Sequence, residues 1–253
     1  RSLLQYLTID NVRVTLVAKG LEYNRTAEWY FTPYSVTPFS DEQRRFYQQI
    51  DPSWQFVLPE KNPYICYDLD PMPFENGGSL PELIEDLEGF RLWHLQDDEF
   101  RVPKGVVYVA IDSSHAVASP KNIVKTRLCV EMFLDSLAKE TYQAEIAGMG
   151  YNMYAHQGGV TLTLSGFSQK LPQLLEMILH RFASRDFSPA RFETIKQQLL
   201  RNWRNASQDR PISQLFNALT GLLQPNNPPF ATLVEALEEI EVDELSVFVE
   251  SIL

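Results

Sequence analysis

Six prolines fall between residues 51 and 81, and they divide the chain into two parts. They occupy positions 52, 59, 63, 71, 73 and 81. Proline has no backbone N–H and restricts the residue before it, so this stretch cannot form a long helix or a central strand. It still carries aromatic residues of a kind that a loose, solvated linker lacks, namely Trp54, Phe56, Tyr64, Tyr67 and Phe74. We therefore predict an extended connector over residues 51–80 that lies against a surface.

Charge is distributed unevenly along the chain. Residues 1–100 carry 8 basic and 17 acidic side chains, whereas residues 101–253 carry 14 and 16. The formal net charge of −11 argues against nucleic acid as the main partner, because neutralising phosphates requires clustered Lys and Arg. Two uncharged stretches, 146–169 and 211–234, are long enough to span a membrane, but polar residues, glycines and prolines interrupt them. We predict neither a nucleic-acid partner nor a membrane span.

The part before the connector shows two local patterns. Apolar and mostly polar residues alternate from Val12 to Lys19, which predicts a strand over that range. Ser40 precedes two acidic residues and predicts the start of a helix that runs to about residue 50. The chain begins at Arg1 inside an apolar pattern and shows no leader segment, so we expect it to be a segment of a longer protein.

The part after the connector begins with strand patterns. Residues 90–101 are strand-like with a turn at Asp97-Asp98, and a strong strand runs from Val106 to Ile111. Ser119-Pro120 is an N-cap followed by proline at the first helical position, and we expect that helix to continue to about residue 147. Two further strands, 151–155 and 160–165, flank a glycine-containing turn and predict a hairpin.

Helical patterns dominate the rest of the chain. They cover residues 171–184, 189–207, 212–223, 230–239 and 243–252. The order of a strand, a long helix, a hairpin and then several helices predicts an α+β fold. In that fold the helices pack on one face of an antiparallel sheet.

The histidines and cysteines do not form a recognisable site. The histidines are His94, His115, His156 and His180. A zinc peptidase needs two His one helical turn apart and a Glu that activates water, as in HExxH or HxxEH, and the residues after each His give neither. Cys66 and Cys129 have no CxxC partner, and we interpret an isolated helical Cys as a small buried hydrophobe. We predict no catalytic, cofactor-binding or metal-binding residue.

Three charged stretches can each be interpreted either as a structural feature or as a binding site. We interpret Asp97-Asp98-Glu99 as a solvated turn, with a cation site as the alternative. Residues 235–250 hold seven acids, which we interpret as a charged outer face, with a metal site as the alternative. The stretch 181–210 is either a solvated helix face or a surface for an anion or an acidic partner. Its basic residues are Arg181, Arg185, Arg191, Lys196, Arg201, Arg204 and Arg210.

Several short motifs follow one another in a characteristic order. The first are Asn11-Val12-Arg13-Val14, Thr26-Ala27-Glu28-Trp29-Tyr30, Thr32-Pro33-Tyr34, and Leu58-Pro59 with Asn62. The later ones are Leu92 to Phe100, Pro103-Lys104, Ala144 to Gly148 with Tyr151, Ser165-Gly166-Phe167 with Lys170, and Arg191-Phe192-Glu193. Over essentially all 253 residues the chain resembles the insulinase/pitrilysin family of zinc metallopeptidases, and its bacterial members most of all.

The resemblance implies a parent peptidase of two homologous halves, joined by an extended connector and closing into a chamber that admits peptides. This chain would hold the end of the second domain over residues 1–50, the connector over 51–80, and a third, non-catalytic domain over 81–253. The third domain would lack its last strand and leave an open sheet edge. The family's zinc site, HxxEH with a more distant Glu, belongs to the first domain and has no counterpart here.

The resemblance therefore implies a non-catalytic segment of a zinc-dependent metalloendopeptidase. The segment would supply chamber wall, hinge and contacts to the catalytic half, and its partners would be the rest of the parent and peptide substrates. Zinc would be bound by the parent and not by this chain. The alternative is a stand-alone, non-enzymatic binding or scaffold protein of the same fold. Likeness to the bacterial members leads us to expect a periplasmic location.

Overall fold

The computed structural model describes residues 2–49, 51–53, 55, 57–74, 78–184, 188–224 and 226–252. Trp54 and Phe56 of the predicted connector and Arg185 of the basic stretch lie outside the described residues, as does the side chain of Glu250. The chain forms two units, Arg1–Glu60 and Lys61–Leu253.

The first unit consists of short elements. It holds the 3₁₀ helices Leu4–Tyr6 and Ile9–Asn11, the strands β1 (Arg25–Thr26) and β2 (Pro33–Tyr34), and helix α1 (Asp41–Gln48). The two strands pair antiparallel. Helix α1 begins as expected at Ser40, which forms a capping box with Gln43. None of the described residues of this unit is buried.

The predicted strand over residues 12–19 is wrong. Residues 12–18 have no strand hydrogen bonds, and Lys19 lies in a turn. Alternation shows which side chains a strand could bury, but a strand also needs a partner for its N–H and C=O groups, and no described segment pairs with this one. Its apolar side chains are accordingly exposed, with Val17 at 89%.

The second unit begins with residues 61–81, whose described part forms no helix or strand. Several side chains of this segment nevertheless contact the rest of the unit. Tyr64 is only 6% exposed. Asn62 Nδ2 donates to the carbonyl of Gln143 at 2.7 Å, and Asn62 Oδ1 accepts from the N–H of Tyr64 at 2.8 Å. The sulfur of Cys66 lies 3.2 Å from Gln169 Oε1. These contacts anchor the segment to the rest of the second unit.

Two antiparallel sheets follow. Strands β3 (Glu82–Leu87) and β4 (Phe90–His94) form a hairpin that turns at Gly89, where φ is +77°. The predicted strand over residues 90–101 is therefore only partly right, because β4 ends at His94 and residues 95–101 are not strand. Strands β5 (Lys104–Asp112), β6 (Gly150–His156) and β7 (Gly159–Phe167) form a second sheet in the order β5-β7-β6, which confirms the predicted strand and hairpin.

Helix α2 (Pro120–Leu137) starts where its cap predicts, because Ser119 Oγ accepts from the N–H of Asn122 at 3.1 Å. It ends earlier than expected, and the short helix α3 (Tyr142–Ile146) follows. Thr141 is buried at the break and donates its hydroxyl to the carbonyl of Leu137. The remaining helices agree closely with the predicted ranges: α4 (Leu171–Ser184), α5 (Pro189–Asn205), α6 (Pro211–Leu223), α7 (Phe230–Glu238) and α8 (Val242–Ile252).

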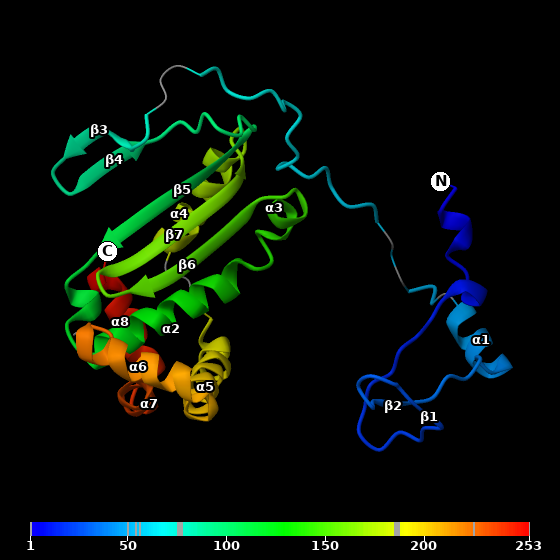
Figure 1. The fold of residues 1–253 in the computed structure, drawn as a ribbon. Coiled ribbons are helices and arrows are strands. Elements are labelled where there is room, and N and C mark those ends of the chain that lie inside the picture. The colour runs from blue at the N-terminus through cyan, green and yellow to red at the C-terminus, as the bar shows by residue number, and fades with distance from the viewer. Residues whose placement is uncertain are drawn as a thin grey trace. The chain divides into compact units, whose positions relative to one another are not determined.

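Helix α2 lies along one face of the β5-β7-β6 sheet and contributes to two cores (Figure 1). One core fills the space between the sheet, α2 and α4, and includes Phe133, Leu164 and Leu174. The other joins α2 to α5, α7 and α8, and includes Leu128 and Leu233. The predicted α+β fold, with an antiparallel sheet that helices cover on one face, is confirmed.

Candidate functional site

The histidines are not brought together. His94 lies on β4, His115 in the 3₁₀ helix His115–Val117, His156 on β6 and His180 on α4. In the described part of the chain, no three His, Cys, Asp or Glu side chains are grouped so that they could hold a metal ion. These residues therefore do not fit the zinc of a metallopeptidase.

His156 belongs to a hydrogen-bond network at the tip of the β6–β7 hairpin. The N–H of Gly158 donates to His156 Nδ1 at 3.1 Å, so this nitrogen acts as an acceptor. The proton of the neutral ring then lies on Nε2, which is 3.0 Å from Thr161 Oγ1 and donates to it. Both ring nitrogens are thus used within the hairpin, and neither offers a lone pair to a metal.

The acidic turn binds its own backbone. Asp97 accepts from the N–H of Glu99 at 3.2 Å and from the N–H of Phe100 at 3.4 Å. This is the local bonding by which Asp stabilises turns. The geometry favours the turn interpretation over the cation site.

Part of the basic stretch is paired with acids of the same unit. Arg191 on α5 donates two hydrogen bonds to the carboxylate of Asp135, at 2.7 and 2.9 Å, and this pairing lowers the pKa of Asp135. Arg204 pairs with Glu238 on α7. Part of the positive charge of the stretch is thus compensated within the unit, which leaves less of it for an external anion. The acidic residues 235–250 supply one of these partners.

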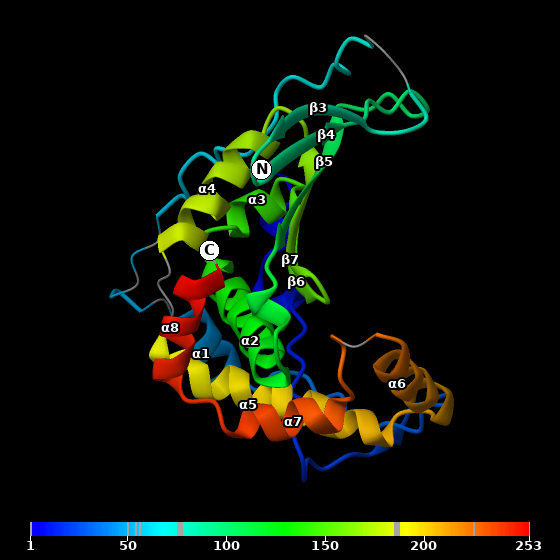
Figure 2. The same cartoon turned by 90° about the vertical axis from the view of Figure 1, so that its left-hand side faces the viewer.

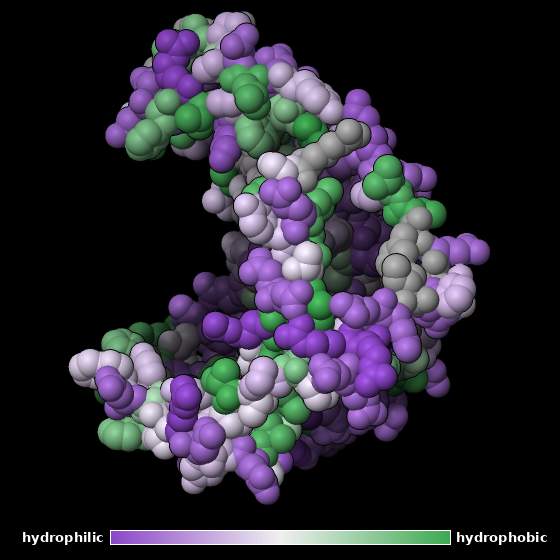
Figure 3. Space-filling view, turned by 90° about the vertical axis from the view of Figure 1, so that its right-hand side faces the viewer, coloured by the Kyte–Doolittle hydropathy of each residue, from purple (hydrophilic) through white to green (hydrophobic). Residues whose placement is uncertain are grey.

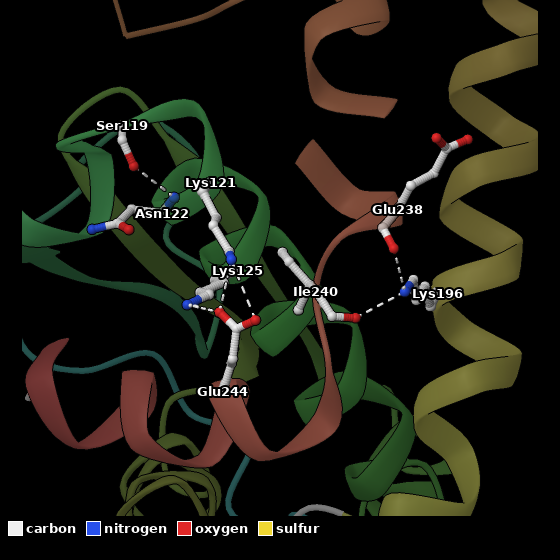
Figure 4. Close-up of polar contacts among 8 residues, drawn as sticks. All are labelled: Ser119, Lys121, Asn122, Lys125, Lys196, Glu238, Ile240 and Glu244. Carbon is white, nitrogen blue, oxygen red and sulfur yellow. Dashed lines mark hydrogen bonds and ion pairs between the residues drawn. The ribbon is translucent and has the colours of Figure 1, made fainter. Parts of the chain in front are cut away.

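Lys196 lies on the apolar face of α5 and is 8% exposed, whereas the sequence predicted a charged surface position. Its Nζ donates to the carbonyl of Glu238 at 3.1 Å and to the carbonyl of Ile240 at 2.8 Å (Figure 4). These carbonyls belong to the end of α7 and the residues after it, where a helix leaves acceptors without partners. The ammonium group therefore ties α5 to the α7–α8 connection.

Glu244 on α8 forms ion pairs with two lysines of α2 (Figure 4). Its carboxylate lies 2.8 Å from Lys125 Nζ and 3.0 Å from Lys121 Nζ. Hydrogen bonds from Lys125 and Lys121 lower the pKa of Glu244 to about 2. This cluster joins α8 to the beginning of α2.

Both cysteines are free thiols. Cys129 on α2 is 7% exposed, and burial raises the pKa of its thiol, which keeps the group in the unreactive protonated form. The interpretation of Cys129 as a small buried hydrophobe is confirmed. Cys66 is partly buried, and its thiol donates to the carbonyl of Asp68 at 2.9 Å.

A cavity of about 270 Å³ lies beside the tip of the β6–β7 hairpin. Its lining comes from the 3₁₀ helix His115–Val117, from α2, from this hairpin and from the segment between α6 and α7. Asn226 joins the segment between α6 and α7 to the hairpin, because its Nδ2 donates to the carbonyl of Gln157 at 3.2 Å. No acidic side chain lines the cavity among the described residues. Its polar lining residues are Thr126, Arg127, His156, Gln157, Gln224, Asn226 and Asn227.

Helix α6 presents an apolar surface outside both cores. It contains no charged residue and no buried residue. In Figure 2 it stands apart from the layer formed by α5 and α7. Its large apolar side chains repeat with helical spacing and are 43–83% exposed: Ile212, Leu215, Phe216, Leu219, Leu222 and Leu223. An uncharged apolar stripe of this kind is typical of a surface that another protein segment covers.

The β3–β4 hairpin is also apolar and exposed. All of its residues are exposed, including Leu83 at 41% and Trp93 at 56%. Figure 3 shows hydrophobic residues on the molecular surface at several places. A two-stranded hairpin is only marginally stable on its own, so this one is expected to gain stability from a partner surface.

A protein-family model matches residues 1–236 of the chain, and that family is described as the middle or third domain of peptidase M16. The chain belongs to the M16 peptidase family. Because the match runs through both units, it covers the first unit, the anchored segment at residues 61–67 and most of the α+β unit.

Individual relatives agree with the M16 assignment. The chain is 32% identical to insulin-degrading enzyme of Homo sapiens and 28% identical to a putative zinc protease, mug138, of Schizosaccharomyces pombe. The two matches cover 99% and 94% of this chain, but only 25% and 24% of the relatives. The crystal structure of pitrilysin has the same fold, with a TM-score of 0.74 at 24% identity over 91% of this chain and 25% of that one. The chain thus spans about a quarter of the proteins that it matches.

The sequence reasoning missed three features of this M16 segment. Lys196 follows Phe192 and Ile195 and precedes Leu199, so its place on the apolar face of α5 could have been recognised. The position of Arg127 could have been recognised as well, because it lies between Thr126 and Leu128, which are both buried on α2. The joining of Glu244 to two lysines more than a hundred residues away could not have been recognised, because it depends on how α8 packs against α2.

Proposed function

We propose that this chain is a non-catalytic segment of a zinc-dependent metalloendopeptidase. The observation that carries the proposal is the match of residues 1–236 to the middle or third domain of the M16 family. One of the relatives is named a zinc protease and another an insulin-degrading enzyme. When bound, zinc supplies a Lewis acid that activates water for peptide hydrolysis. We place that zinc elsewhere in the parent, because the described residues of this chain do not fit it.

In this proposal the chain contributes wall, hinge and inter-half contacts to a chamber that confines peptides. Confinement contributes to specificity by limiting which substrates can reach a productive geometry. The exposed apolar stripe of α6 and the exposed β3–β4 hairpin support the contact role, since both suit burial against other parts of a larger protein. The connector segment would serve as the hinge.

The catalytic part of the proposal is tested by comparing the chain with its parent. We expect the purified chain to contain no stoichiometric zinc by elemental analysis and to leave a quenched fluorescent peptide intact. The parent should bind zinc and cleave the same peptide in a reaction that a chelator stops. Stoichiometric zinc in the chain alone, together with chelator-sensitive cleavage, would show that the segment is itself catalytic.

The contact role is tested by placing a charge on α6 in the parent. Phe216→Glu puts a carboxylate into the apolar stripe, and we expect it to lower the melting temperature and the rate of peptide cleavage. Ser213→Glu adds the same charge at an exposed polar position of the same helix and serves as the control. Equal behaviour of the two variants would remove α6 from the contact surface.

We also propose a periplasmic location for the parent, on the basis of its likeness to the bacterial members of the family. Cell fractionation followed by immunodetection tests this directly. Recovery of the parent with cytoplasmic markers would contradict it.

A further inference from the structure

The cavity beside the β6–β7 hairpin is lined by a half-buried cation, Arg127, most of whose N–H groups donate to no described residue. Arg127 is half-buried by α2 and its neighbours, and burial lowers the pKa of its guanidinium group. One of its five N–H groups donates to Asn227 Oδ1 at 3.0 Å, and the guanidinium carbon lies 5.9 Å from the ring centre of Trp203. In the described part of the chain, Arg127 has no acidic partner.

Comparison with Lys196 shows how unusual this arrangement is. Lys196 is likewise a cation on a helix beside an aromatic ring, but it is buried and two backbone carbonyls accept its hydrogen bonds at 2.8 and 3.1 Å. A buried charge is costly unless it is paired and hydrogen-bonded. Arg127 has one amide oxygen and an aromatic face instead, and it lines a cavity that a ligand could enter.

The rest of the lining determines which anion would fit. Gln157, Gln224 and Asn226 line the cavity beside Arg127, and each side-chain amide offers both a donor and an acceptor, as a peptide group requires. Ala116, Val117, Ile123 and Ala155 supply an apolar wall. The volume of about 270 Å³ lies just below the range of about 300–1,000 Å³ that is usual for small-molecule pockets, so it suits one or two residues and not a long segment.

We propose that this cavity binds a carboxylate, and specifically the C-terminal residue of a short peptide. The carboxylate would accept hydrogen bonds from Arg127 and the neighbouring amides. The last peptide group would pair with the Gln and Asn side chains, and a small side chain would face the apolar wall. The site is a binding site and involves no covalent step. It does not depend on whether the parent cleaves peptides, so its failure would leave the proposed function unchanged.

The test is a titration of the 253-residue chain, followed by the ¹H–¹⁵N NMR signals of backbone and side-chain amides. N-acetyl-L-alanine represents a peptide C-terminus, acetate a free carboxylate, and inorganic phosphate a general anion. N-acetyl-L-alaninamide keeps the peptide groups but lacks the charge. We expect N-acetyl-L-alanine to bind saturably at the amides of Gln157 and Asn227. We expect the uncharged amide to bind at least about tenfold more weakly, because the charge-assisted hydrogen bonds are lost.

Two variants locate the site. Arg127→Gln should weaken the binding of N-acetyl-L-alanine at least about tenfold, whereas Arg191→Gln, which removes a paired surface arginine, should leave it unchanged. Gln157→Ala removes an exposed side chain and is not expected to disturb folding, so it keeps the test valid if Arg127→Gln unfolds. It should weaken binding several-fold.

Three results would overturn the proposal. The first is the absence of saturable shifts at these amides, and the second is equal binding of N-acetyl-L-alanine to the chain with and without Arg127 or Gln157. The third is equal binding of acetate or phosphate and N-acetyl-L-alanine, which would show an anion site without recognition of a peptide terminus.

Discussion

The two units differ in what they bury. The second unit has two cores that meet on α2, with side chains such as Leu128 and Leu174 fully inaccessible to solvent. The first unit is also rich in apolar residues, but none of its described residues is buried, and Val17 and Trp29 are 89% and 86% exposed. Fixing a residue costs conformational entropy, which burial must offset. The first unit buries too little apolar surface by itself to offset this cost. The second unit buries apolar side chains in two cores, one between α2, α4 and the sheet and one between α2, α5, α7 and α8.

The sharpest way to break this comparison is to remove the same side chain from each unit. Leu174→Ala in α4 should lower the free energy of unfolding by about 3–4 kcal/mol, because it creates a cavity in a closed core. Leu16→Ala in the first unit should change it by less than about 0.5 kcal/mol, because Leu16 is 71% exposed. Urea unfolding followed by far-UV circular dichroism measures both. Equal effects would mean that the first unit has a core after all.

Glycines with positive φ give a second comparison. Gly159 at the start of β7 has φ of +151°, and a Cβ there would lie 2.1 Å from the carbonyl oxygen of Ile111 on β5. Gly20 in the first unit has φ of +79°, with open space around its Cβ position. Gly159→Ala should destabilise by about 3 kcal/mol, since strain and steric overlap add, and Gly20→Ala by about 1 kcal/mol from strain alone.

The same denaturation experiment measures the two alanine variants. A Gly159→Ala protein as stable as Gly20→Ala would show that β5 and β7 can separate locally at little cost, contrary to their continuous pairing.

The sequence predicts the second unit better than the first for a physical reason. The β6–β7 hairpin and α4 depend on local signals, namely turn residues and apolar residues with helical spacing, and the predicted ranges were confirmed. The strand over residues 12–19 was wrong because alternation cannot supply a pairing partner. The predicted helix over residues 120–147 was too long because the glycine expected to end it, Gly148 with φ of +79°, follows the short helix α3 instead of α2.

The third comparison is between a buried cation, Lys196, and two exposed ones. Lys196→Met keeps most of the side-chain volume but leaves the carbonyls of Glu238 and Ile240 without their donor. We expect a loss of about 2 kcal/mol in the free energy of unfolding, within the cost of unsatisfied buried acceptors. Arg201→Met removes an exposed cation from the same helix, and Lys19→Met removes one from the first unit. Both should stay within about 0.5 kcal/mol.

A loss for Lys196→Met no larger than that of its two controls would mean that water replaces the ammonium group. Such a result would place the end of α7 at the surface, against the burial of Ile240.

The candidate site was less predictable than the fold. The absence of a metallopeptidase motif could be recognised from the residues that follow each histidine. Arg127 and Asn227 are a hundred residues apart, however, and they come together only because the segment between α6 and α7 returns to α2. A cavity of this kind depends on tertiary packing, so neither spacing nor composition indicates it.

The smallest expected effect concerns ion pairs. The pKa of Glu244 is lowered to about 2 by Lys125 and Lys121, from an ordinary value of 4.5. Because the folded-state pKa is the lower one, the stabilisation is present above pH 4.5 and is lost as the pH falls through about 2. Glu244→Gln should therefore be less stable than the parent sequence at pH 7 and equally stable near pH 2. The side chain is 35% exposed, so solvent screening keeps the difference below about 1 kcal/mol.

The ion pair of Asp10 with Arg44 in the first unit is the matched case. It is more exposed, at 74% and 38% for the two side chains, and Asp10→Asn should change stability less than Glu244→Gln does. Urea unfolding of both variants at pH 7 and at low pH, with and without added salt, measures the difference. If the deficit of Glu244→Gln persisted unchanged at pH 2, its carboxylate charge would not be what holds α8 to α2. The contrast between the two units would then rest on apolar burial alone.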